Sequence, residues 1–412
     1  MPYYGVSAAI TSFIELNALK KQTHRSISLR EIEQNRARLS QARRKAYLAF
    51  KRKGLASTKN DENMRSGVAA GEAGLKKIPV PEVLSLTRNQ KDTLDFLSYA
   101  SSPSRRSRRN RRRPGTKPSS YFDFVGLKHI SPAAALVLCS VYDVFQRRGG
   151  DFKVFDYDDW NPDVKDTFAQ VGFFKWLDFQ GLPSSYDYEG ALSIQAFESE
   201  RQHIPEKPVV YLQKLVAAFN FSRESKCETT IDETVSRRVA SSILEAVENS
   251  VRHAYHHGIP KDIRGRWWVG GVSRPASGEV IVACYDCGVS IPGSIEESTS
   301  DDPKGVRKYV RSVIQRYLRA ANINEVENGL DHKRLKVALK YLYSTSDVKG
   351  GGKGLAHIAS TIDECEDGSV EIFTRRAYFC AKKGQRQRFT LLPASMPGTL
   401  IIWRMRLYAQ SN

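Results

Sequence analysis

The sequence has few cysteines and no long apolar run. Its 412 residues include six cysteines at irregular spacings, which excludes a disulfide-stabilised scaffold and favours a reducing compartment. No stretch approaches the roughly 18 unbroken apolar residues that a membrane helix requires. The first residues also lack the basic, apolar and small-residue regions of a signal peptide. We therefore expect a cytoplasmic protein with no transmembrane segment.

Ligands for metal or redox chemistry are equally sparse. The only C-x-x-C pair is Cys284 and Cys287, and a structural zinc site would need a second pair of ligands. Because Cys284 stands in an apolar run that continues to Asp286, we expect a buried strand end here instead. No phosphoacceptor histidine is recognisable on a helical hairpin, which argues against a sensor histidine kinase.

The whole chain has a net charge of +19, and this positive charge is concentrated in its first part. Residues 1–118 contain 26 Lys and Arg against 9 Asp and Glu, whereas residues 119–412 contain 38 against 36. Such a segment can bind nucleic acid non-specifically through the phosphates, contact an anionic membrane surface, or remain a solvated tail. No zinc-finger, homeodomain or RNA-recognition signature is present, so base-specific binding is not expected.

A chain of this length is expected to fold as two or three domains. Residues 30–53 predict a basic helix, and a glycine-containing passage follows. Residues 104–117 form a like-charge run that should remain solvated. We therefore place a domain boundary near residue 118 and interpret residues 1–118 as a basic N-terminal region.

The second segment, residues 119–182, alternates strands and helices. Its pattern predicts a strand through Phe124, a helix over 132–147, a strand over 152–155 and a second helix over 162–171. This order and the string GLKHISPAAALVL resemble a STAS domain, the small α/β fold of anti-sigma-factor antagonists. The resemblance implies a protein partner for this domain.

The start of the predicted helix departs from the STAS pattern. Where that family carries a phosphorylated serine, this sequence has Ser131 followed by Pro132 and alanines, and Ser131 can equally be the N-cap of the helix. We therefore expect a structural or docking role rather than phosphorylation-driven partner exchange. Residues 183–228 are interpreted as a connector with a strand-like piece at 191–197 and a helix at 211–219.

A long amphipathic helix follows the connector. The string TTIDETVSRRVASSILEAVENSVRHAYHHG begins with capping residues, ends at Gly258 and predicts a helix of about 25 residues. Apolar residues at spacings of three and four predict its buried stripe: Val235, Val239, Ile243, Ala246, Val247, Val251 and Ala254. Glu245, Asn249 and His253 lie at i, i+4 and i+8, so they share one face, which is either a solvated surface or part of a site.

Three later segments carry features of a ligand site. An apolar strand ends at Asp286 and is followed by a turn at Gly288. The string KGGGKGL places glycines before a helix that starts near Leu355, and backbone N–H groups at such a turn bind anions. The string PGTLIIWRM places Thr399 at the start of a terminal strand.

In this order, the four segments resemble the GHKL superfamily, the ATPase fold of gyrases, chaperones, histidine kinases and mismatch-repair proteins. EAVENSVRHAY is similar to its N box, DCGVSIP and GGGKGL to its two glycine boxes, and GTLIIW to its final strand. The resemblance covers residues 230–406, and the HAY ending is similar to the anti-sigma-factor serine-kinase branch. It implies an α/β sandwich over residues 229–412 in which helices cover a mixed sheet.

The resemblance also implies a role for each matching residue. Asn249 would coordinate the Mg²⁺ that bridges the ATP phosphates, and Glu245 would be the catalytic general base. Asp286 would accept a hydrogen bond from the adenine amine. The other ATP contacts that the resemblance implies are Gly288, Gly350, Gly352, Lys353 or Lys349, Gly354, Leu355 and Thr399.

The sequence departs from the GHKL pattern at two points. Ser290 replaces the second glycine of the first glycine box, a change expected to stiffen the turn. About 60 residues separate Asp286 from the second glycine box, and they include helices predicted over 304–321 and 331–343. We therefore expect an enlarged lid that closes over ATP.

The expected function is an ATP-dependent regulatory or conformational switch with Mg-ATP hydrolysis. Two alternatives stay open. One is a protein serine kinase of the anti-sigma-factor type that acts on a STAS partner, and the other is a non-catalytic ATP-binding module that recruits nucleic acid through residues 1–118. Dimerisation is common among GHKL relatives, so a homodimer is a further open expectation.

Overall fold

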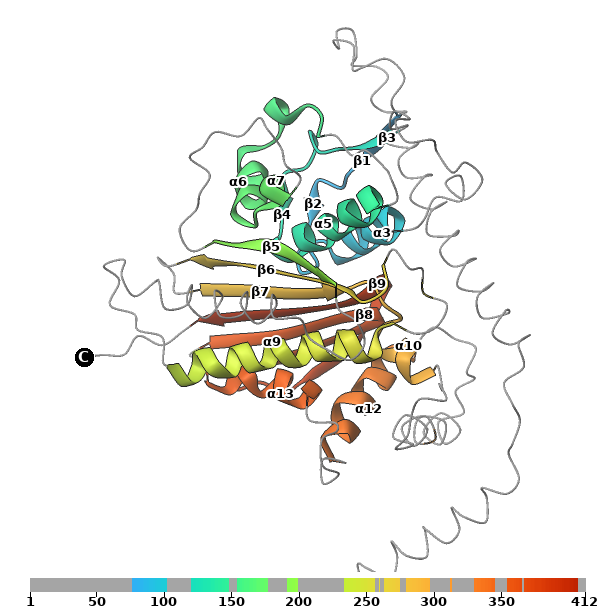
Figure 1. Cartoon of the computed structure of the whole chain (residues 1–412), viewed down its shortest axis with the longest axis vertical. Helices are drawn as coiled ribbons and strands as arrows, with labels where there is room; N and C mark the ends of the chain where they lie inside the picture. The colour runs from blue at the N-terminus through green and yellow to red at the C-terminus, as the bar shows by residue number, and fades with distance from the viewer. Residues whose placement is uncertain are drawn as a thin grey trace, which may run out of the picture. The chain divides into compact units, whose positions relative to one another are not determined.

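The computed structural model describes part of the chain between residues 76 and 406, all of it within one compact unit, residues 52–412. The described ranges are 76–101, 120–147, 154–176, 191–198, 233–255, 263–274, 279–296, 330–344, 354–364 and 367–406, with residues 259 and 312. They form an α/β fold with helices on both faces of one central sheet (Figure 1). Apart from residue 312, the features predicted over 30–53, 104–117, 211–219 and 304–321 lie outside these ranges.

The central sheet contains five strands, paired in the order β5-β6-β7-β9-β8. They are β5 (Ala191–Glu198), β6 (Arg266–Arg274), β7 (Glu279–Asp286), β8 (Asp367–Lys382) and β9 (Arg388–Arg406). All four pairings are antiparallel, so within the described ranges the sheet is not mixed as predicted. Only a few residues join β6 to β7 and β8 to β9, and connections this short allow only antiparallel neighbours.

Strand β5 lies in the segment that was predicted to be a connector. The strand-like piece at 191–197 is confirmed, but it pairs with β6 from Ala191↔Val272 to Glu198↔Arg266 and is therefore the edge strand of the sheet. Its partner strand lies about 70 residues further along the chain, so the local pattern gives no sign of the pairing.

One face of the sheet is covered by helices that follow β5 in sequence (Figure 1). They are α9 (Glu233–His253), α12 (Asp331–Ser344) and α13 (Gly354–Ser360), with the short α10 (Ile291–Glu296) beside them. The predicted long helix and the helix predicted over 331–343 are confirmed as α9 and α12. The predicted stripe of α9 is buried at Val239, Ile243, Ala246, Val247 and Val251.

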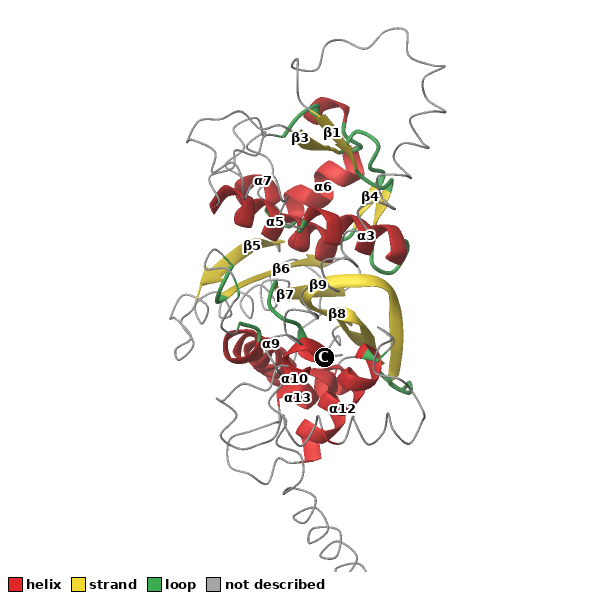
Figure 2. Ribbon diagram, turned by 90° about the vertical axis from the view of Figure 1, so that its right-hand side faces the viewer, coloured by secondary structure: helices red, strands yellow, loops and turns green. Residues whose placement is uncertain are grey.

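The other face of the sheet is covered by α3 (Gln90–Ala100) and α5 (Pro132–Arg147) (Figure 2). Trp268 of β6 and Tyr285 of β7 are paired across the sheet and fully buried, with ring centroids 5.8 Å apart. Seven consecutive residues of β7 are buried. Burial on both faces explains why the sequence of β7 is a nearly continuous apolar run.

Two short parallel strand pairs adjoin α3 and α5. β1 (Lys76–Pro79) pairs with β3 (Ser120–Asp123), and β2 (Val83–Leu84) pairs with β4 (His129–Ile130). Three short helices complete this part: η1 (Tyr157–Asp159), α6 (Pro162–Gln170) and α7 (Phe173–Trp176). The helices predicted over 132–147 and 162–171 are confirmed as α5 and α6. Residues 154 and 155 of the strand predicted over 152–155 are not in a strand, and the other two lie outside the described ranges.

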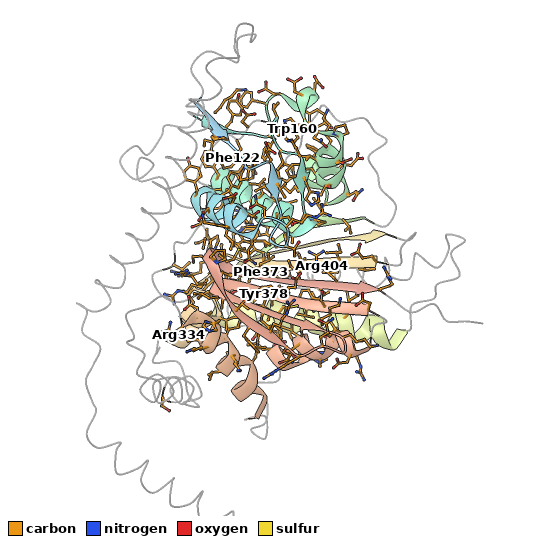
Figure 3. The ribbon with its side chains drawn as sticks, turned by 180° about the vertical axis from the view of Figure 1, so that it is seen from behind. Phe122, Trp160, Arg334, Phe373, Tyr378 and Arg404 are labelled. Carbon is orange, nitrogen blue, oxygen red and sulfur yellow. The ribbon has the colours of Figure 1, made fainter. Side chains whose placement is uncertain are left out.

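Aromatic side chains form the core of this N-terminal part (Figure 3). Phe122 of β3 packs against Tyr142 of α5 with ring centroids 6.0 Å apart, and Phe124 packs against Trp160 at 4.8 Å. Ser131 caps α5, because its Oγ accepts a hydrogen bond from Ala134 N at 3.3 Å. The N-cap interpretation of Ser131 is thereby confirmed.

The domain boundary predicted near residue 118 is wrong. Strands β1 and β2 and helix α3 precede it, yet they pair or pack with elements that follow it. Leu94, Phe96 and Leu97 of α3 are fully buried. The high charge of residues 1–118 taken together conceals this apolar stretch, which forms part of the fold before the arginine-rich run begins.

Candidate functional site

Asp286 is a buried carboxylate at the end of β7, with 4% of its surface exposed. Its Oδ1 accepts a hydrogen bond from Gly288 N at 2.9 Å, and its Oδ2 accepts one from Ser250 Oγ at 3.0 Å. The backbone of Thr399, its partner in the β7–β9 ladder, also hydrogen-bonds to it. Elements far apart in the sequence therefore converge on this carboxylate.

Burial raises the pKa of the Asp286 carboxyl to about 6, although the hydrogen bonds from Gly288, Ser250 and Thr399 oppose the shift. Desolvation disfavours the charged form of a carboxyl, whereas donors favour it. Each carboxylate oxygen can accept more than one hydrogen bond. Asp286 thus retains acceptor capacity at a place where water is largely excluded.

Helix α9, which carries the predicted N box, contacts this carboxylate through Ser250. Ser250, which donates to Asp286, directly follows Asn249, and Glu245 lies one turn earlier. Asn249 and Glu245 are half-buried. Asn249 Nδ2 is buried and has no hydrogen-bond partner among the described residues. Because an unsatisfied buried amide costs about 1–3 kcal/mol, its position is typical of a group that binds a ligand or water.

The end of α9 is fastened to the turn that follows β7. Val289 N donates a hydrogen bond to Ala254 O at 2.8 Å, and Tyr255 OH donates to Arg266 O at the start of β6. A Cβ on Gly288 would overlap the backbone carbonyl and side chain of Ala254. Gly288 is therefore required for the close approach of the turn to the helix.

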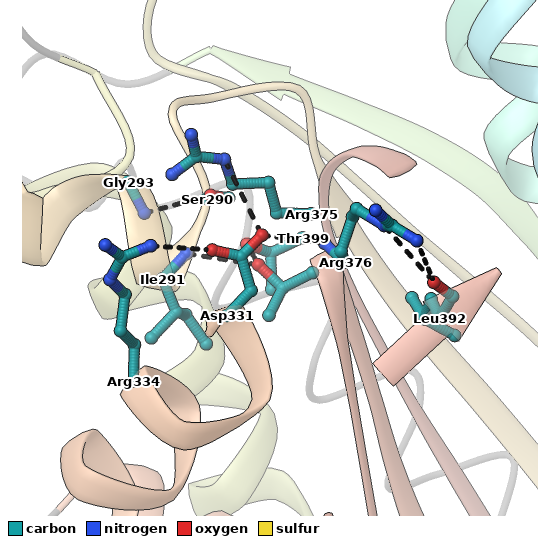
Figure 4. Close-up of polar contacts among 10 residues, drawn as sticks. Ser290, Ile291, Gly293, Asp331, Arg334, Arg375, Arg376, Leu392 and Thr399 are labelled. Atoms are coloured by element: carbon teal, nitrogen blue, oxygen red, sulfur yellow. Dashed lines mark hydrogen bonds and ion pairs between the residues drawn. The ribbon is translucent and has the colours of Figure 1, made fainter. Parts of the chain in front are cut away.

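A threonine pair extends the polar network from Thr399 (Figure 4). Thr399 Oγ1 lies 3.1 Å from Thr374 Oγ1, and Thr374 Oγ1 accepts a hydrogen bond from Ile291 N at 3.1 Å. Thr399 does not begin a strand as predicted, because β9 already starts at Arg388 as the second arm of a long hairpin with β8. Gly398, with φ +86°, carries the chain past the backbone of Asp286.

An ionic cluster that sequence reasoning missed lies beside the threonines (Figure 4). Asp331, the first residue of α12, accepts hydrogen bonds from Arg334 Nη1 at 3.1 Å and from Arg376 N at 3.2 Å. Arg375 Nε lies 3.8 Å from the same carboxylate, and Arg375 has φ +54° at a bulge in β8. The cluster anchors α12 next to Thr374, and Leu335 and Ala338 of α12 are fully buried in the core, so this helix of the predicted lid belongs to the packed fold. No sequence signal pointed to the cluster, since its members lie far apart in the chain.

The structure thus brings Asp286, Gly288 and Thr399 together, and Asn249 and Glu245 lie on the helix whose Ser250 contacts Asp286. Leu355 is buried against α9 in the core rather than exposed at a site. The helix predicted to start near Leu355 is confirmed as α13, which begins at Gly354. The other predicted phosphate contacts lie outside the described residues: Lys349, Gly350, Gly352 and Lys353.

Ser290, which replaces a glycine of the first glycine box, has φ +77°, a left-handed conformation that favours glycine. Its Oγ accepts a hydrogen bond from Gly293 N at 3.1 Å. The serine side chain therefore satisfies a backbone N–H in the first turn of α10, although its own backbone has a conformation that is unfavourable for any residue other than glycine.

The C-x-x-C pair forms the predicted strand end. Cys284 is buried within β7, and Cys287 lies just beyond it, with its Sγ 3.8 Å from Tyr255 OH. Burial raises the pKa of the Cys284 thiol strongly and raises the pKa of the Cys287 thiol to about 12. Both thiols are therefore protonated at neutral pH, so they are poor catalytic nucleophiles and react only slowly.

No protein-family model matches the chain, and no curated protein matches it either. Within the described ranges, no group of three or more His, Cys, Asp or Glu side chains is arranged to hold a metal ion. The same part of the chain contains no helix long and apolar enough to span a bilayer.

Proposed function

We propose that residues 229–412 bind Mg-ATP in the manner of a GHKL domain. The observation that carries this proposal is the buried Asp286 carboxylate at the meeting point of β7, β9 and α9. A buried acceptor of this kind pairs with a neutral donor, and the exocyclic amine of adenine is one. It would also discriminate against guanine, which carries a carbonyl oxygen in the corresponding position.

The residues near Asp286 fit the rest of the nucleotide. Asn249 would hold Mg²⁺ through its amide oxygen. Its buried Nδ2 has no hydrogen-bond partner among the described residues, which favours a ligand at this side chain. Magnesium commonly uses only one or two protein ligands beside substrate phosphates, so the site needs no larger cluster. When bound, the ion neutralises charge on the phosphates. The glycine-rich residues before α13 would supply backbone N–H groups to them.

Hydrolysis is the more specific part of the proposal. Glu245 lies one turn before Asn249 on α9, so it can act as the base that aligns and deprotonates water. Closure of the predicted lid over the nucleotide would couple turnover to a change of conformation. These features favour a conformational switch driven by turnover over a static ATP-binding module.

Incubation of the full chain with Mg²⁺ and γ-labelled ATP tests the proposal. We expect free labelled phosphate from the wild type and none from Asp286→Asn. Label transferred to an added STAS protein would show a serine kinase instead. Bound ATP that stays intact would show a non-catalytic module. Absence of any nucleotide binding by the wild type would refute the proposal altogether.

A further inference from the structure

A buried ion pair joins the N-terminal part of the fold to the central sheet. Asp143 of α5 and Arg266 of β6 have side chains only 7% and 2% exposed. Asp143 Oδ2 accepts hydrogen bonds from Arg266 Nε at 3.1 Å and from Trp268 Nε1 at 3.2 Å, and Arg266 Nη2 lies 3.0 Å from the same oxygen in an ion pair. Its other oxygen accepts one from Arg147 Nε at 3.1 Å. Four N–H donors thus converge on a single carboxylate between α5 and the sheet.

The backbone carbonyl of Arg266 is linked to residues near the proposed nucleotide site. Its carbonyl accepts the hydrogen bond of Tyr255, the residue that follows the end of α9, and the same hydroxyl lies 3.8 Å from Cys287 Sγ. The next residue, Trp267, is the partner of Asp286 in the β6–β7 ladder. Arg266 is therefore bonded to α5 through its side chain, and its backbone carbonyl is linked through Tyr255 to Cys287 in the turn after Asp286.

We propose that Asp143 is a positioning residue for the nucleotide site. By fixing Arg266, Asp143 holds Tyr255 and the turn from Asp286 to Gly288 in the geometry that binds adenine. This inference rests on the ATP site proposed above. Apolar residues of the same volume are often as stabilising as a buried ion pair. We therefore infer that the role of this pair is to hold Tyr255 and the turn in one conformation rather than to add stability. The N-terminal part of the fold would then help to position the residues of the ATP site through Asp143.

The test compares three variants of the full chain. Asp143→Asn removes the charge and points an amide N–H at donors. Trp268→Phe is a milder change that removes one hydrogen bond to Asp143 and keeps a ring in place. Phe168→Leu is the control, because Phe168 packs in the aromatic core with Trp160 at a ring distance of 5.7 Å and takes no part in the hydrogen bonds of Asp143. Thermal unfolding of each variant measures the loss of stability.

Two readouts separate positioning from general loss of stability. The first is the Kd for Mg-ATP, measured well below the unfolding temperature. The second needs no nucleotide: the rate at which a maleimide labels Cys287, followed by mass spectrometry of its peptide. Asp143→Asn should weaken ATP binding and speed labelling by about tenfold each, and Trp268→Phe by a few-fold, because hydrogen bonds to a charged group are lost. Phe168→Leu should change neither by more than about twofold at a similar loss of stability.

The outcomes distinguish this inference from the proposed function. If the wild type binds ATP but Asp143→Asn and Trp268→Phe bind and label as the wild type does, the positioning role is wrong and the ATP site stands. If Phe168→Leu has the same effects as the other two, Asp143 contributes only stability. If the wild type fails to bind ATP, both proposals fail, whatever the labelling rate. Should Asp143→Asn not fold, Trp268→Phe alone decides.

Discussion

At the scale of single residues, Asp286 is a group that the fold does not stabilise in its charged form. Burial raises its pKa from an ordinary value of 3.8 to about 6. A carboxyl whose pKa is higher in the folded than in the unfolded state stabilises the protein at low pH. That contribution is lost as the pH rises from about 4 to about 6. At neutral pH the charged acceptor therefore costs folding free energy, as binding groups often do.

We therefore expect Asp286→Asn to be more stable than the wild type at about pH 8, by on the order of 1–3 kcal/mol. The amide keeps an acceptor for Gly288 N and removes the buried charge. The gain should shrink near pH 4.5, where Asp286 is mostly protonated. Urea unfolding at both pH values measures the effect, with Asp367→Asn at an exposed position as control. A difference that does not change with pH would show that Asp286 titrates normally.

Variants at Glu245 distinguish an effect on ATP binding from an effect on ATP hydrolysis. Glu245→Ala and Glu245→Gln should leave ATP affinity within about twofold of the wild type and reduce hydrolysis roughly 10²–10⁴-fold, because the base is lost while the adenine contacts remain. Calorimetry and phosphate release measure the two quantities. Glu248→Gln, which neutralises another half-buried carboxylate of α9, is the matched control. Equal losses of binding and hydrolysis would make Glu245 a structural residue.

At the scale of elements, α9 and the turn after β7 behave as one unit, because their contact leaves no room for a side chain at Gly288. Gly288→Ala should destabilise the protein by about 1–3 kcal/mol through overpacking and weaken ATP binding by at least about tenfold. Gly126→Ala is the control, since a Cβ there meets nothing within 4 Å. Thermal unfolding and calorimetry would contradict the account if both variants behaved alike.

Elements with a local pattern could be predicted from the sequence, and elements made by distant pairing could not. The periodicity of α5 and α9 predicted their positions, and the apolar run of β7 predicted the strand that ends at Asp286. The strand at 191–197 was predicted, but its place in the sheet depends on a partner that is remote in sequence. Ser250 and Thr374 escaped prediction because they are ordinary residue types whose partners lie 36 and 25 residues away.

At the scale of the whole molecule, the basic charge lies in two separate segments. Residues 1–75 contain 14 Lys and Arg against 6 Asp and Glu, and residues 102–119 contain 8 against none. Residues 76–101 between them are nearly neutral and belong to the fold. An account of the chain as one basic arm followed by folded domains is therefore too simple, and each segment needs its own test.

We expect non-specific nucleic-acid binding to depend on both segments. A variant that lacks residues 1–75 and carries glutamine for the arginines of 105–113 should lose salt-sensitive binding to unrelated oligonucleotides by about 10³-fold or more, because several phosphate contacts are removed. Its ATP affinity should not change. Deletion of residues 1–118 is unsuitable, since it removes β1, β2 and α3. If the wild type binds no oligonucleotide at low salt, the basic segments have another role.

The claim that the described fold is an ATP-binding domain organised around Asp286 is tested most directly by titration calorimetry of the full chain with Mg-ATP at about pH 7.5. We expect the wild type to bind ATP and to bind GTP at least about tenfold more weakly. Guanine has a carbonyl oxygen at the position where adenine has the amine that would donate a hydrogen bond to Asp286. Folded Asp286→Asn should bind ATP at least about tenfold more weakly than the wild type, since its amide places a donor opposite the adenine amine. Equal affinity of the wild type and Asp286→Asn for ATP would contradict the account.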